Sequence, residues 1–375
     1  MKSVVFYFQM HQPRRIKEYR RSEVSHNHDY FWEEKNKEIL ERIIEKCYVP
    51  MTKVLIENDI KSSISISGVL LEQLLDMNSS VIDLLKEYFK SGMGEILGET
   101  YYHSLSSIWD EEEFKRQVEK HIDTLSRTFG IIPSTFRNTE LIYNDKISQM
   151  VKDLGFETII TEGTDEIISK NSPNFIYKTI SGLNLFLRNY RLSDDISFRF
   201  SNRSWNEYPL FADKYAKWIF MTEGDVINLF MDYETFGEHN WKETGIFDFM
   251  RALPNELKKY GIDLFTINEA VKNKGKKYEL GINKTISWAD TERDLSAWLG
   301  NDMQIEAFEM MKTLKNSKNK DLWGLLQTSD HFYYMSTKHF SDQEVHEYFN
   351  PYHSPYLAFI YYTNILEDFY KTFLD

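Results

Sequence analysis

The sequence has little of what cross-links a chain or anchors it in a membrane. Its 375 residues include one cysteine, Cys47, which excludes an internal disulfide framework. The apolar run near the amino terminus, Val4–Phe8, is too short for a signal-peptide core. No stretch approaches the ~18 consecutive apolar residues of a membrane-spanning helix. We therefore expect a soluble, cytoplasmic protein with no membrane partner.

Basic residues are also scarce relative to acidic ones. Lys and Arg number 45 against 58 Asp and Glu, which gives a net charge of -13, and the densest basic cluster is residues 272–277. Nucleic acid binds to basic surfaces, so it is not an expected partner. The glycine patterns that cradle phosphates, GxGxxG and GxxxxGK[ST], are missing as well, and this argues against nucleotide use.

What the chain does contain, from residue 3 to about residue 271, is an alternation of short apolar runs with stretches of helical spacing. The candidate strands are residues 3–8, 62–67, 95–97, 134–137, 157–161, 185–192, 226–231 and 263–266. The candidate helices are residues 32–58, 79–90, 110–129 and 146–154. Such alternation is typical of a parallel sheet wrapped by helices, and the number of units predicts an α/β barrel that is closed or nearly closed.

Beyond residue 271 the pattern changes. A lysine-rich connection, residues 272–278, is followed by helical segments alone, at 304–316, 322–335 and 341–374. We therefore predict a barrel domain, residues 1–271, and a carboxyl-terminal helical domain, residues 272–375. The stretches 287–301 and 327–335 concentrate acids, indoles and an imidazole, so the helical domain is expected to contribute to a site.

Unusual polar residues follow the carboxyl ends of the predicted strands. After the apolar run 226–231, the residues Asp232, Glu234, Glu238 and His239 come within eight positions. Burying such groups is unfavourable unless each has a partner or a task. In barrels, the loops at the carboxyl ends of the strands converge to form the active face. We expect the functional site at that end.

Two carboxylates at the ends of different strands, Glu140 and Asp232, match the needs of a retaining glycosidase. That chemistry uses one ionised carboxylate and one protonated acid, with the carboxyl groups ~5 to 5.5 Å apart. Structural ion pairs are the plainer alternative. Another is a metal site formed by His11, His103, Asp232 and His239, although no HxxxH or HExxH spacing accompanies it.

Cationic and aromatic side chains are further candidates for sugar recognition. Guanidinium groups orient hydroxyls or hold carboxylates in place, and flat rings stack on sugar faces. Salt bridges at the barrel rim and ordinary core packing are the alternatives for each of them. The candidates are Arg137, Arg188, Arg199, Trp288, Trp298, Tyr101 and Tyr102.

Five patterns in order along the chain resemble those of glycoside hydrolase family 57, closest to its α-amylase-type branch. They are HQP at 11–13, GMGEILGETYYH at 92–103, FRNTE at 136–140, MDYETFG at 231–237 and QTSDHFYY at 327–334. The resemblance implies an incomplete (β/α)7 barrel closed by a helical domain, and no metal or organic cofactor. It also implies that Glu140 is the nucleophile and Asp232 the general acid/base.

Several other side chains are expected to bind the substrate. The resemblance assigns the sugar at the cleaved bond to His11, Glu95, His103, Glu234 and Asp330. The cationic and aromatic candidates Arg137, Arg188, Trp288 and Trp298, together with His331 of the fifth pattern, complete the expected substrate-binding set.

The expected activity is retaining hydrolysis of α-1,4-glucans such as starch or glycogen, or of maltooligosaccharides. A 4-α-glucanotransferase or a glucan branching enzyme would use the same site. An inactive glycan-binding protein is the alternative from another class, and a metal-dependent polysaccharide deacetylase is a weaker one. Residues 92–95 read GMGE where the family often has GQLE, so substrate length and the balance of hydrolysis against transfer stay open. Linkage preference, oligomeric state and working temperature are not determined by the sequence.

Overall fold

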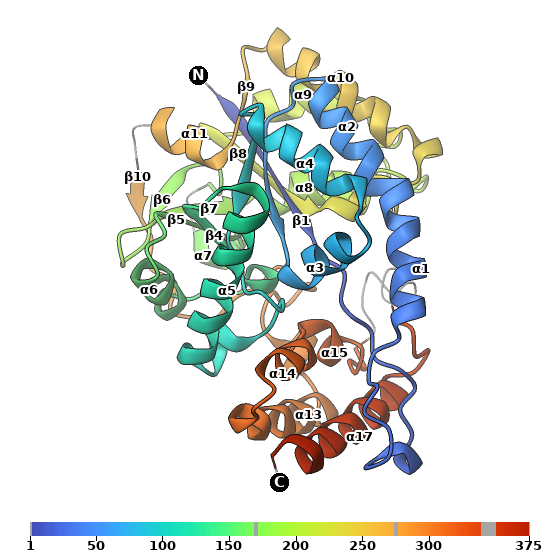
Figure 1. Ribbon diagram of the computed structural model, residues 1–375. Helices are drawn as coiled ribbons and strands as arrows, with labels where there is room; N and C mark the ends of the chain where they lie inside the picture. The colour runs from blue at the N-terminus through green and yellow to red at the C-terminus, as the bar shows by residue number, and fades with distance from the viewer. Residues whose placement is uncertain (1, 169–171, 274–276, 339–349, 375) are drawn as a thin grey trace.

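Seven parallel strands form the centre of the molecule (Figure 1). The computed structural model describes residues 2–168, 172–273, 277–338 and 350–374. Around the barrel the strands follow the order β8-β1-β2-β3-β4-β5-β7. Their bounds are β1 Ser3–Met10, β2 Ser62–Ile66, β3 Gly94–Leu97, β4 Thr135–Arg137, β5 Thr158–Glu162, β7 Asn184–Arg188 and β8 Val226–Asp232.

The strands are joined unevenly around the barrel. Continuous ladders pair β1 with β2 and β8, β2 with β3, β4 with β5, and β5 with β7. A single bridge between Gly98 and Phe136 joins β3 to β4. Between β7 and β8 the described residues form isolated hydrogen bonds, such as the one that Asn228 Nδ2 donates to the Leu187 carbonyl at 2.9 Å. The architecture is the expected incomplete (β/α)7 barrel.

Three short strands extend this arrangement. β9 (Asp263–Phe265) lies beside the start of β1, β6 (Ile176–Lys178) runs antiparallel to β7, and β10 (Lys277–Glu279) pairs with β6. β6 and β10 were not among the predicted strands. β10 overlaps residues 272–278, which were predicted to be a surface connection, so that prediction was wrong at its end.

The strand predicted at 185–192 was too long. β7 ends at Arg188, and helix α8 (Tyr190–Ser197) begins directly after it. Asn189 caps that helix, since its side-chain oxygen accepts a hydrogen bond from Leu192 N at 3.1 Å. The apolar residues of the strand and of the first helical turn had merged into one run in the sequence.

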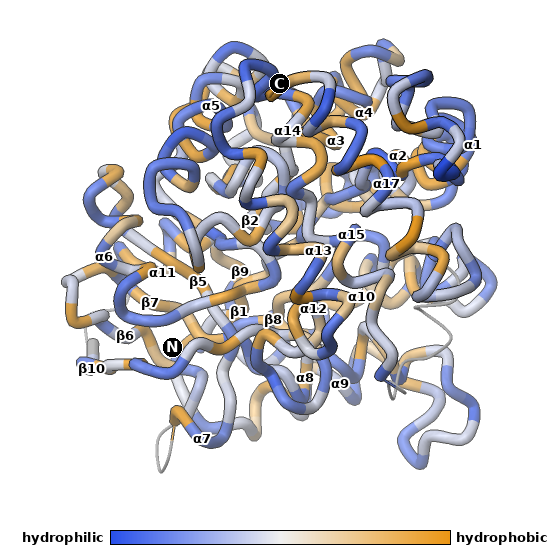
Figure 2. Tube along the Cα trace, turned by 90° about the horizontal axis from the view of Figure 1, so that it is seen from below, coloured by the Kyte–Doolittle hydropathy of each residue, from blue (hydrophilic) through white to orange (hydrophobic). Residues whose placement is uncertain are grey.

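Helices cover the outside of the barrel, and their tubes show bands of hydrophilic and hydrophobic residues in Figure 2. Such banding is expected for helices that bury one face on a core. No helix within the described ranges is both long and apolar enough to span a membrane. The helices between the strands are α1 Glu33–Ile43, α2 Val49–Glu57, α3 Gly68–Asp76, α4 Ser80–Lys90, α5 Glu111–Phe129, α6 Asp145–Asp153, α7 Asp165–Ile168, α8, α9 Ala212–Met221, α10 Ile246–Lys259 and, after β9, α11 Ile267–Asn273.

The helix predicted over 32–58 is interrupted in the structure. A π-helical turn, Ile44–Tyr48, joins α1 to α2. Turns of this kind are rare and occur frequently at functional sites. Here the turn carries Tyr48, whose hydroxyl donates a hydrogen bond to Glu234 beyond the end of β8. The irregularity therefore brings a helix side chain to the carboxyl end of the barrel.

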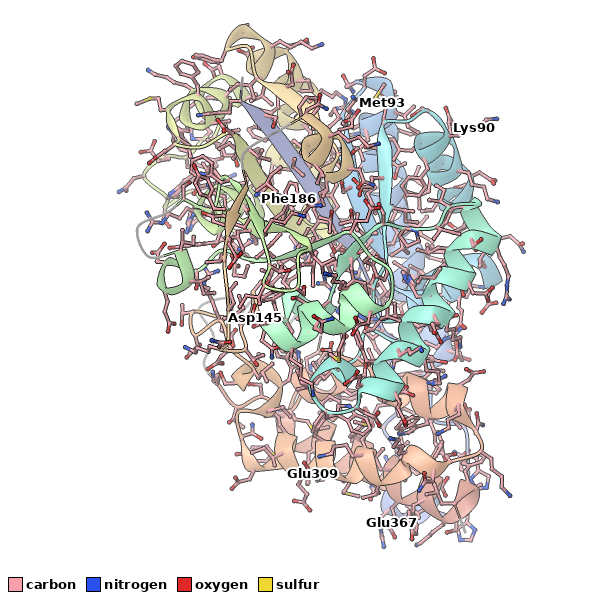
Figure 3. The ribbon with its side chains drawn as sticks, turned by 90° about the vertical axis from the view of Figure 1, so that its left-hand side faces the viewer. Lys90, Met93, Asp145, Phe186, Glu309 and Glu367 are labelled. Carbon is pink, nitrogen blue, oxygen red and sulfur yellow. The ribbon has the colours of Figure 1, made fainter. Side chains whose placement is uncertain are left out.

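Side chains fill the inside of the barrel. Phe186 of β7, labelled in Figure 3, lies among the strands and is fully buried. The rings of Tyr7 from β1 and Phe230 from β8 meet edge to face, with 5.5 Å between their centroids. The packed interior excludes a pore through the barrel, so a substrate has access to its ends only.

A group of helices lies below the carboxyl ends of the strands (Figure 1). In Figure 3, Glu309 of α13 and Glu367 of α17 mark this group, whereas Met93, just before β3, marks the opposite end of the barrel. The helices are α12 Ser296–Leu299, α13 Asp302–Thr313, α14 Lys320–Leu326, α15 Ser329–Tyr333 and α17 Pro355–Phe373.

Two of the predicted carboxyl-terminal helices differ from those observed. The helix expected at 322–335 is split into α14 and α15 by Gln327 and Thr328. In the predicted helix 341–374, residues 341–349 lie outside the described residues, and α17 begins at Pro355, with the Ser354 side chain as its cap. The domain boundary at residues 271 and 272 stays a prediction.

Candidate active site

A cavity of about 1290 Å³ lies at the carboxyl ends of the strands and extends to α12 and α15 of the helical part. Carboxylates, imidazoles, guanidinium groups and aromatic rings line it together. The residues of the expected site that border it are His11, His103, Arg137, Glu140, Arg188, Asp232, Glu234, Trp288, Trp298 and Asp330. Segments far apart in the sequence therefore meet in one space that is large enough for an extended ligand.

Glu140 is held in an unusual backbone conformation just after β4. Its φ and ψ are 57° and 26°, the left-handed region that non-glycine residues adopt at a cost. The preceding Asn138 secures the turn, since its Nδ2 donates to the Ile142 carbonyl at 2.9 Å and to Ser107 Oγ at 2.8 Å. Backbone strain of this size is common at functional sites.

Both carboxylate oxygens of Glu140 have a hydrogen-bond partner. Oε1 pairs with His103 Nε2 at 3.0 Å, and Oε2 accepts a hydrogen bond from Trp288 Nε1 at 2.6 Å. Burial alone would raise the pKa of Glu140, but the hydrogen bond and charge of His103, the charge of Arg137 and the Trp288 hydrogen bond outweigh it and lower the pKa. Glu140 is therefore an ionised carboxylate at neutral pH.

Asp232, the last residue of β8, has the opposite electrostatic character. Burial raises its pKa, and the negative charge of Glu140 raises it further. The nearby charges of Arg137, His103 and Arg188 oppose this effect only in part, and the pKa is about 6. One cavity thus contains a carboxylate that favours the ionised form and a second that retains its proton more readily.

Two histidines stack beside Glu140. The rings of His11 and His103 are nearly parallel, with 3.8 Å between their centroids. His11 Nε2 pairs with Asp330 Oδ2 at 2.9 Å, and His11 Nδ1 with Ser67 Oγ at 2.7 Å. Burial and the charge of His103 lower the pKa of His11, so His11 is neutral. In that state its Nε2–H donates to Asp330 and its Nδ1 accepts from the Ser67 hydroxyl.

Glu234 follows Asp232 by two residues and retains its proton at neutral pH. Burial is the main cause, the charge of Asp232 adds to it, and together they raise the pKa of Glu234 to about 8. Its Oε1 accepts hydrogen bonds from the Tyr48 hydroxyl and, at 3.3 Å, from Gln12 Nε2. A neutral carboxylic acid can donate its proton in a hydrogen bond as well as accept one.

Trp288 lies between the two buried arginines of the site. Its ring centroid is 5.2 Å from the guanidinium carbon of Arg137 and 5.8 Å from that of Arg188. Each guanidinium nitrogen of Arg188 donates one hydrogen bond to protein, to Glu162, Asp194 and the Phe230 carbonyl. Arg137 differs: it is fully buried, and none of its three guanidinium nitrogens has a hydrogen-bond partner within the described part of the chain. Its Nη1 lies 3.7 Å from Glu99 Oε2.

Two residues of the expected substrate-binding set do not line the cavity. Glu95 lies inside the barrel, where its carboxylate accepts hydrogen bonds from Ser63, Thr135 and the backbone of Asn268. His331 points into the helical part, where its ring stacks on Tyr362 and its Nε2 lies 3.2 Å from the Leu325 carbonyl. The structure does not bring either side chain to the cavity.

Of the other aromatic and cationic candidates, some line the cavity and others do not. Arg199 lines the cavity. Tyr101 and Tyr102 do not line it, and they pack on the ammonium group of Lys120, which lies 4.1 and 4.7 Å from their ring centroids. Trp298 lines the cavity although it is almost fully buried.

The sequence matches the family profile described as Glycosyl hydrolase family 57 over residues 5–284. The chain belongs to this family. Its members cleave or transfer glycosidic bonds, so this member is a carbohydrate-active enzyme of the glycosidase or glycosyl-transferring kind. The matched range includes Glu140, Asp232 and the histidine pair.

One sequence relative and two solved structures agree with the family assignment. A protein of Methanocaldococcus jannaschii, whose name assigns it provisionally to the α-amylases, is 45% identical over 394 aligned residues that cover 98% of this chain and 84% of the relative. Among solved structures, the family 57 branching enzyme of Thermococcus kodakaraensis, in complex with glucose, superimposes with a TM-score of 0.67 at 14% identity, covering 94% of this chain and 88% of the other. The 4-alpha-glucanotransferase of Thermococcus litoralis superimposes with a TM-score of 0.62 at 19% identity, covering 89% of this chain and 51% of the other. At such identities these two structures establish the fold alone.

Several residues around the site of this family 57 member were not predicted. Glu99, Tyr48, Gln12 and Arg293 contact the predicted residues or line the cavity. Glu99 lies within the second family pattern and Gln12 within the first, so position in a pattern was a usable signal for both. Tyr48 carried no such signal, because its contact with Glu234 depends on the π-helical turn.

The arrangement expected of a metal centre is not present in the described residues. No group of three or more His, Cys, Asp or Glu side chains there has the geometry of metal ligands. His11 and His103 of the hypothetical metal set are instead bound to Asp330 and Glu140.

Proposed function

We propose that this family 57 member is a retaining enzyme that acts on α-1,4-linked glucans or maltooligosaccharides, with hydrolysis as its main outcome. The observation that carries the proposal is the pair of carboxyl groups in one cavity whose surroundings push their pKa values apart. The 45% identical relative named provisionally as an α-amylase supports the choice of α-glucan and of hydrolysis.

In the first step, Glu140 attacks the anomeric carbon and forms a bond from its carboxylate oxygen to the sugar. Asp232 donates its proton to the glycosidic oxygen as the bond to the leaving sugar breaks. In the second step, Asp232, now a carboxylate, takes a proton from water as that water attacks the anomeric carbon. The bond to Glu140 breaks, and both carboxyl groups return to their starting states. A sugar hydroxyl in place of water would give transfer.

The remaining polar side chains of the cavity bind the sugar in this proposal. Protonated Glu234 offers an O–H to sugar hydroxyl groups, and the buried Arg137 guanidinium, which has no hydrogen-bond partner among the described residues, borders the cavity. Asp330 and His11 act as a fixed pair, and Trp298 and Trp288 supply flat surfaces. Arg188 serves to hold Glu162, Asp194 and the end of β8 in place, because each of its three guanidinium nitrogens donates a hydrogen bond to one of them.

The test compares wild type with Glu140→Gln and Asp232→Asn on maltoheptaose, maltotriose and soluble starch, with and without chelator. We expect maltooligosaccharide release that the chelator does not change, and a fall in rate of about 10³-fold or more in both variants. Glu309→Gln and Asp248→Asn, which change exposed groups on α13 and α10, are matched controls with wild-type rates. With maltotriose as the substrate, accumulation of products longer than maltotriose would assign transfer.

Aryl glycosides separate the two carboxyl roles. A phenolate leaves without a proton, so Asp232→Asn should still release it in a single burst, whereas Glu140→Gln should release none. A wild type that binds glucan but turns over nothing would replace the proposal with a glycan-binding function.

A further inference from the structure

The proposed nucleophile Glu140 is the last member of a buried chain of side chains that begins at Glu99. Glu99, two residues past the end of β3, is fully buried, and its Oε2 lies 3.2 Å from His103 Nδ1. The other ring nitrogen of His103, Nε2, lies 3.0 Å from Glu140 Oε1. One imidazole therefore has a carboxylate on each of its nitrogens. Since both carboxylates are ionised and can only accept, both contacts are hydrogen bonds only if both nitrogens carry protons, which means that the ring is a cation.

The groups that surround His103 agree with this charge state. The neutral His11 ring stacks on one face. Burial and the charge of Arg137 lower the pKa of His103. The hydrogen bonds to Glu140 and Glu99 outweigh them and raise the pKa to about 9. Asp330 and Asp232 are the other acidic groups whose titration responds to the charge of His103.

Glu99 is itself held tightly. Gln9 Nε2 donates to its Oε1 at 3.2 Å, and the Arg137 guanidinium lies 3.7 Å from its Oε2. The backbone N–H of Glu99 donates to His121 Nδ1 at 3.1 Å, and His121 Nε2 lies 2.8 Å from the Ile66 carbonyl. Burial would raise the pKa of Glu99, but the hydrogen bond and charge of His103 and the charge of Arg137 outweigh it, and the pKa is about 2. Glu99 is thus an anion at neutral pH.

We propose that Glu99 is a positioning residue that holds the His103 imidazolium, in fixed orientation, against the Glu140 carboxylate. The inference rests on the proposed function, in which Glu140 becomes an ester to the sugar and loses its charge. In that intermediate, a buried His103 cation next to Arg137 would lack a counter-charge on its Glu140 side. Glu99 supplies the charge that keeps His103 protonated, so that the imidazolium is in place when the Glu140 carboxylate leaves again.

The decisive variant is Glu99→Gln, which keeps the shape of the side chain and removes its charge. We expect kcat to fall by about 10- to 100-fold, with less than about a threefold change in KM, because the lost interaction acts on the intermediate and transition states. In ¹⁵N-histidine NMR titrations, the His103 signal, assigned by its disappearance in His103→Gln, should titrate at lower pH in Glu99→Gln than in wild type. A merely structural role would leave that titration unchanged.

Glu113→Gln is the matched control, since Glu113 is also buried and bonded to an arginine, Arg116, but lies on α5 outside the cavity. It should keep the wild-type His103 titration and kcat. If Glu99→Gln does not fold, Glu99→Asp carries the test: it preserves the charge but shortens the reach, so kcat should fall while His103 still titrates well above its usual value.

Unchanged kcat and an unchanged His103 titration in Glu99→Gln would overturn the inference and leave the proposed function standing. A wild type without turnover on glucans would refute the proposed function instead. The His103 titration does not depend on turnover, and it would still show whether Glu99 holds the imidazolium.

Discussion

Replacing the Asp232 carboxyl group by an amide is expected to raise the stability of the protein while it lowers the activity. Burial in the cavity and the neighbouring Glu140 charge raise its pKa from the ordinary value of 3.8 to about 6. The folded protein therefore binds this proton more tightly than the unfolded chain does, and ionising Asp232 costs folding free energy. At about 1.36 kcal/mol per pKa unit, this rise in pKa corresponds to a loss of about 3 kcal/mol in the free energy of unfolding.

The pH dependence of this cost follows from its sign. Below pH 3.8 the carboxyl group is protonated in both states, and it costs nothing. Between 3.8 and about 6 only the unfolded chain loses the proton, so stability falls as pH rises, and above about 6 the full cost is present. Asp232→Asn removes the ionisable group and keeps the shape. We expect the variant to be more stable than wild type at pH 7.5, by up to about 3 kcal/mol, and equally stable near pH 4.

The assay is thermal unfolding of both proteins across this pH range at a fixed scan rate. For a chain of this size, 3 kcal/mol corresponds to a rise in Tm on the order of 3 to 6 °C. Asp248→Asn, at an exposed position on α10, is the control and should show no pH-dependent difference from wild type. The reasoning would be refuted if the Tm difference for Asp232→Asn were the same at pH 4 and pH 7.5, because the gain would then not come from the ionised carboxylate.

Two further substitutions test contacts that only the structure shows. Tyr48→Phe removes the hydroxyl that donates to buried Glu234. With the fold retained, kcat/KM on maltoheptaose should fall by about tenfold or more. Unchanged kinetics would mean that Glu234 does not act on the sugar. Gly237→Ala would place a Cβ atom 1.9 Å from the Lys46 carbonyl at a φ of +104°, so we expect a large loss of soluble yield and Tm. Gly130→Ala, where the Cβ would meet open space at a φ of +70°, should cost far less, and equal losses in the two variants would contradict the steric argument.

The parts of this protein that could be predicted from the sequence are those in which a local pattern has one physical meaning. The apolar run 226–231 is buried as strand β8 because it has the length and composition of a strand in a two-faced sheet. The helix predicted over 110–129 is observed as α5, with Asp110 as its cap, whose side chain accepts from the backbone of Glu112 and Glu113. The alternation of such elements predicted a closed or nearly closed barrel, and the family resemblance implied that it is incomplete.

The candidate site was predicted in composition but not in its contacts. Family patterns identified Glu140 and Asp232, and the alternation of strands and helices put them at one end of a barrel. The same patterns also proposed Glu95, whose carboxylate the structure uses inside the barrel, since Ser63 and Thr135 of neighbouring strands offer it hydrogen bonds there. A pattern states which residue is present, whereas the direction of its side chain depends on neighbours from other strands.

Local sequence patterns thus specify the seven barrel strands, several of the helices and the set of acids and histidines from which the cavity is built, because these depend on residues close together in the chain. Which of these residues meet depends on the folded chain. The raised pKa of Asp232, the charge of His103 between Glu99 and Glu140, and the hydrogen bond from Trp288 to Glu140 all depend on burial and on distances between segments up to 148 residues apart. Burial and interatomic distance are properties of the folded chain, and no local spacing in the sequence specifies them.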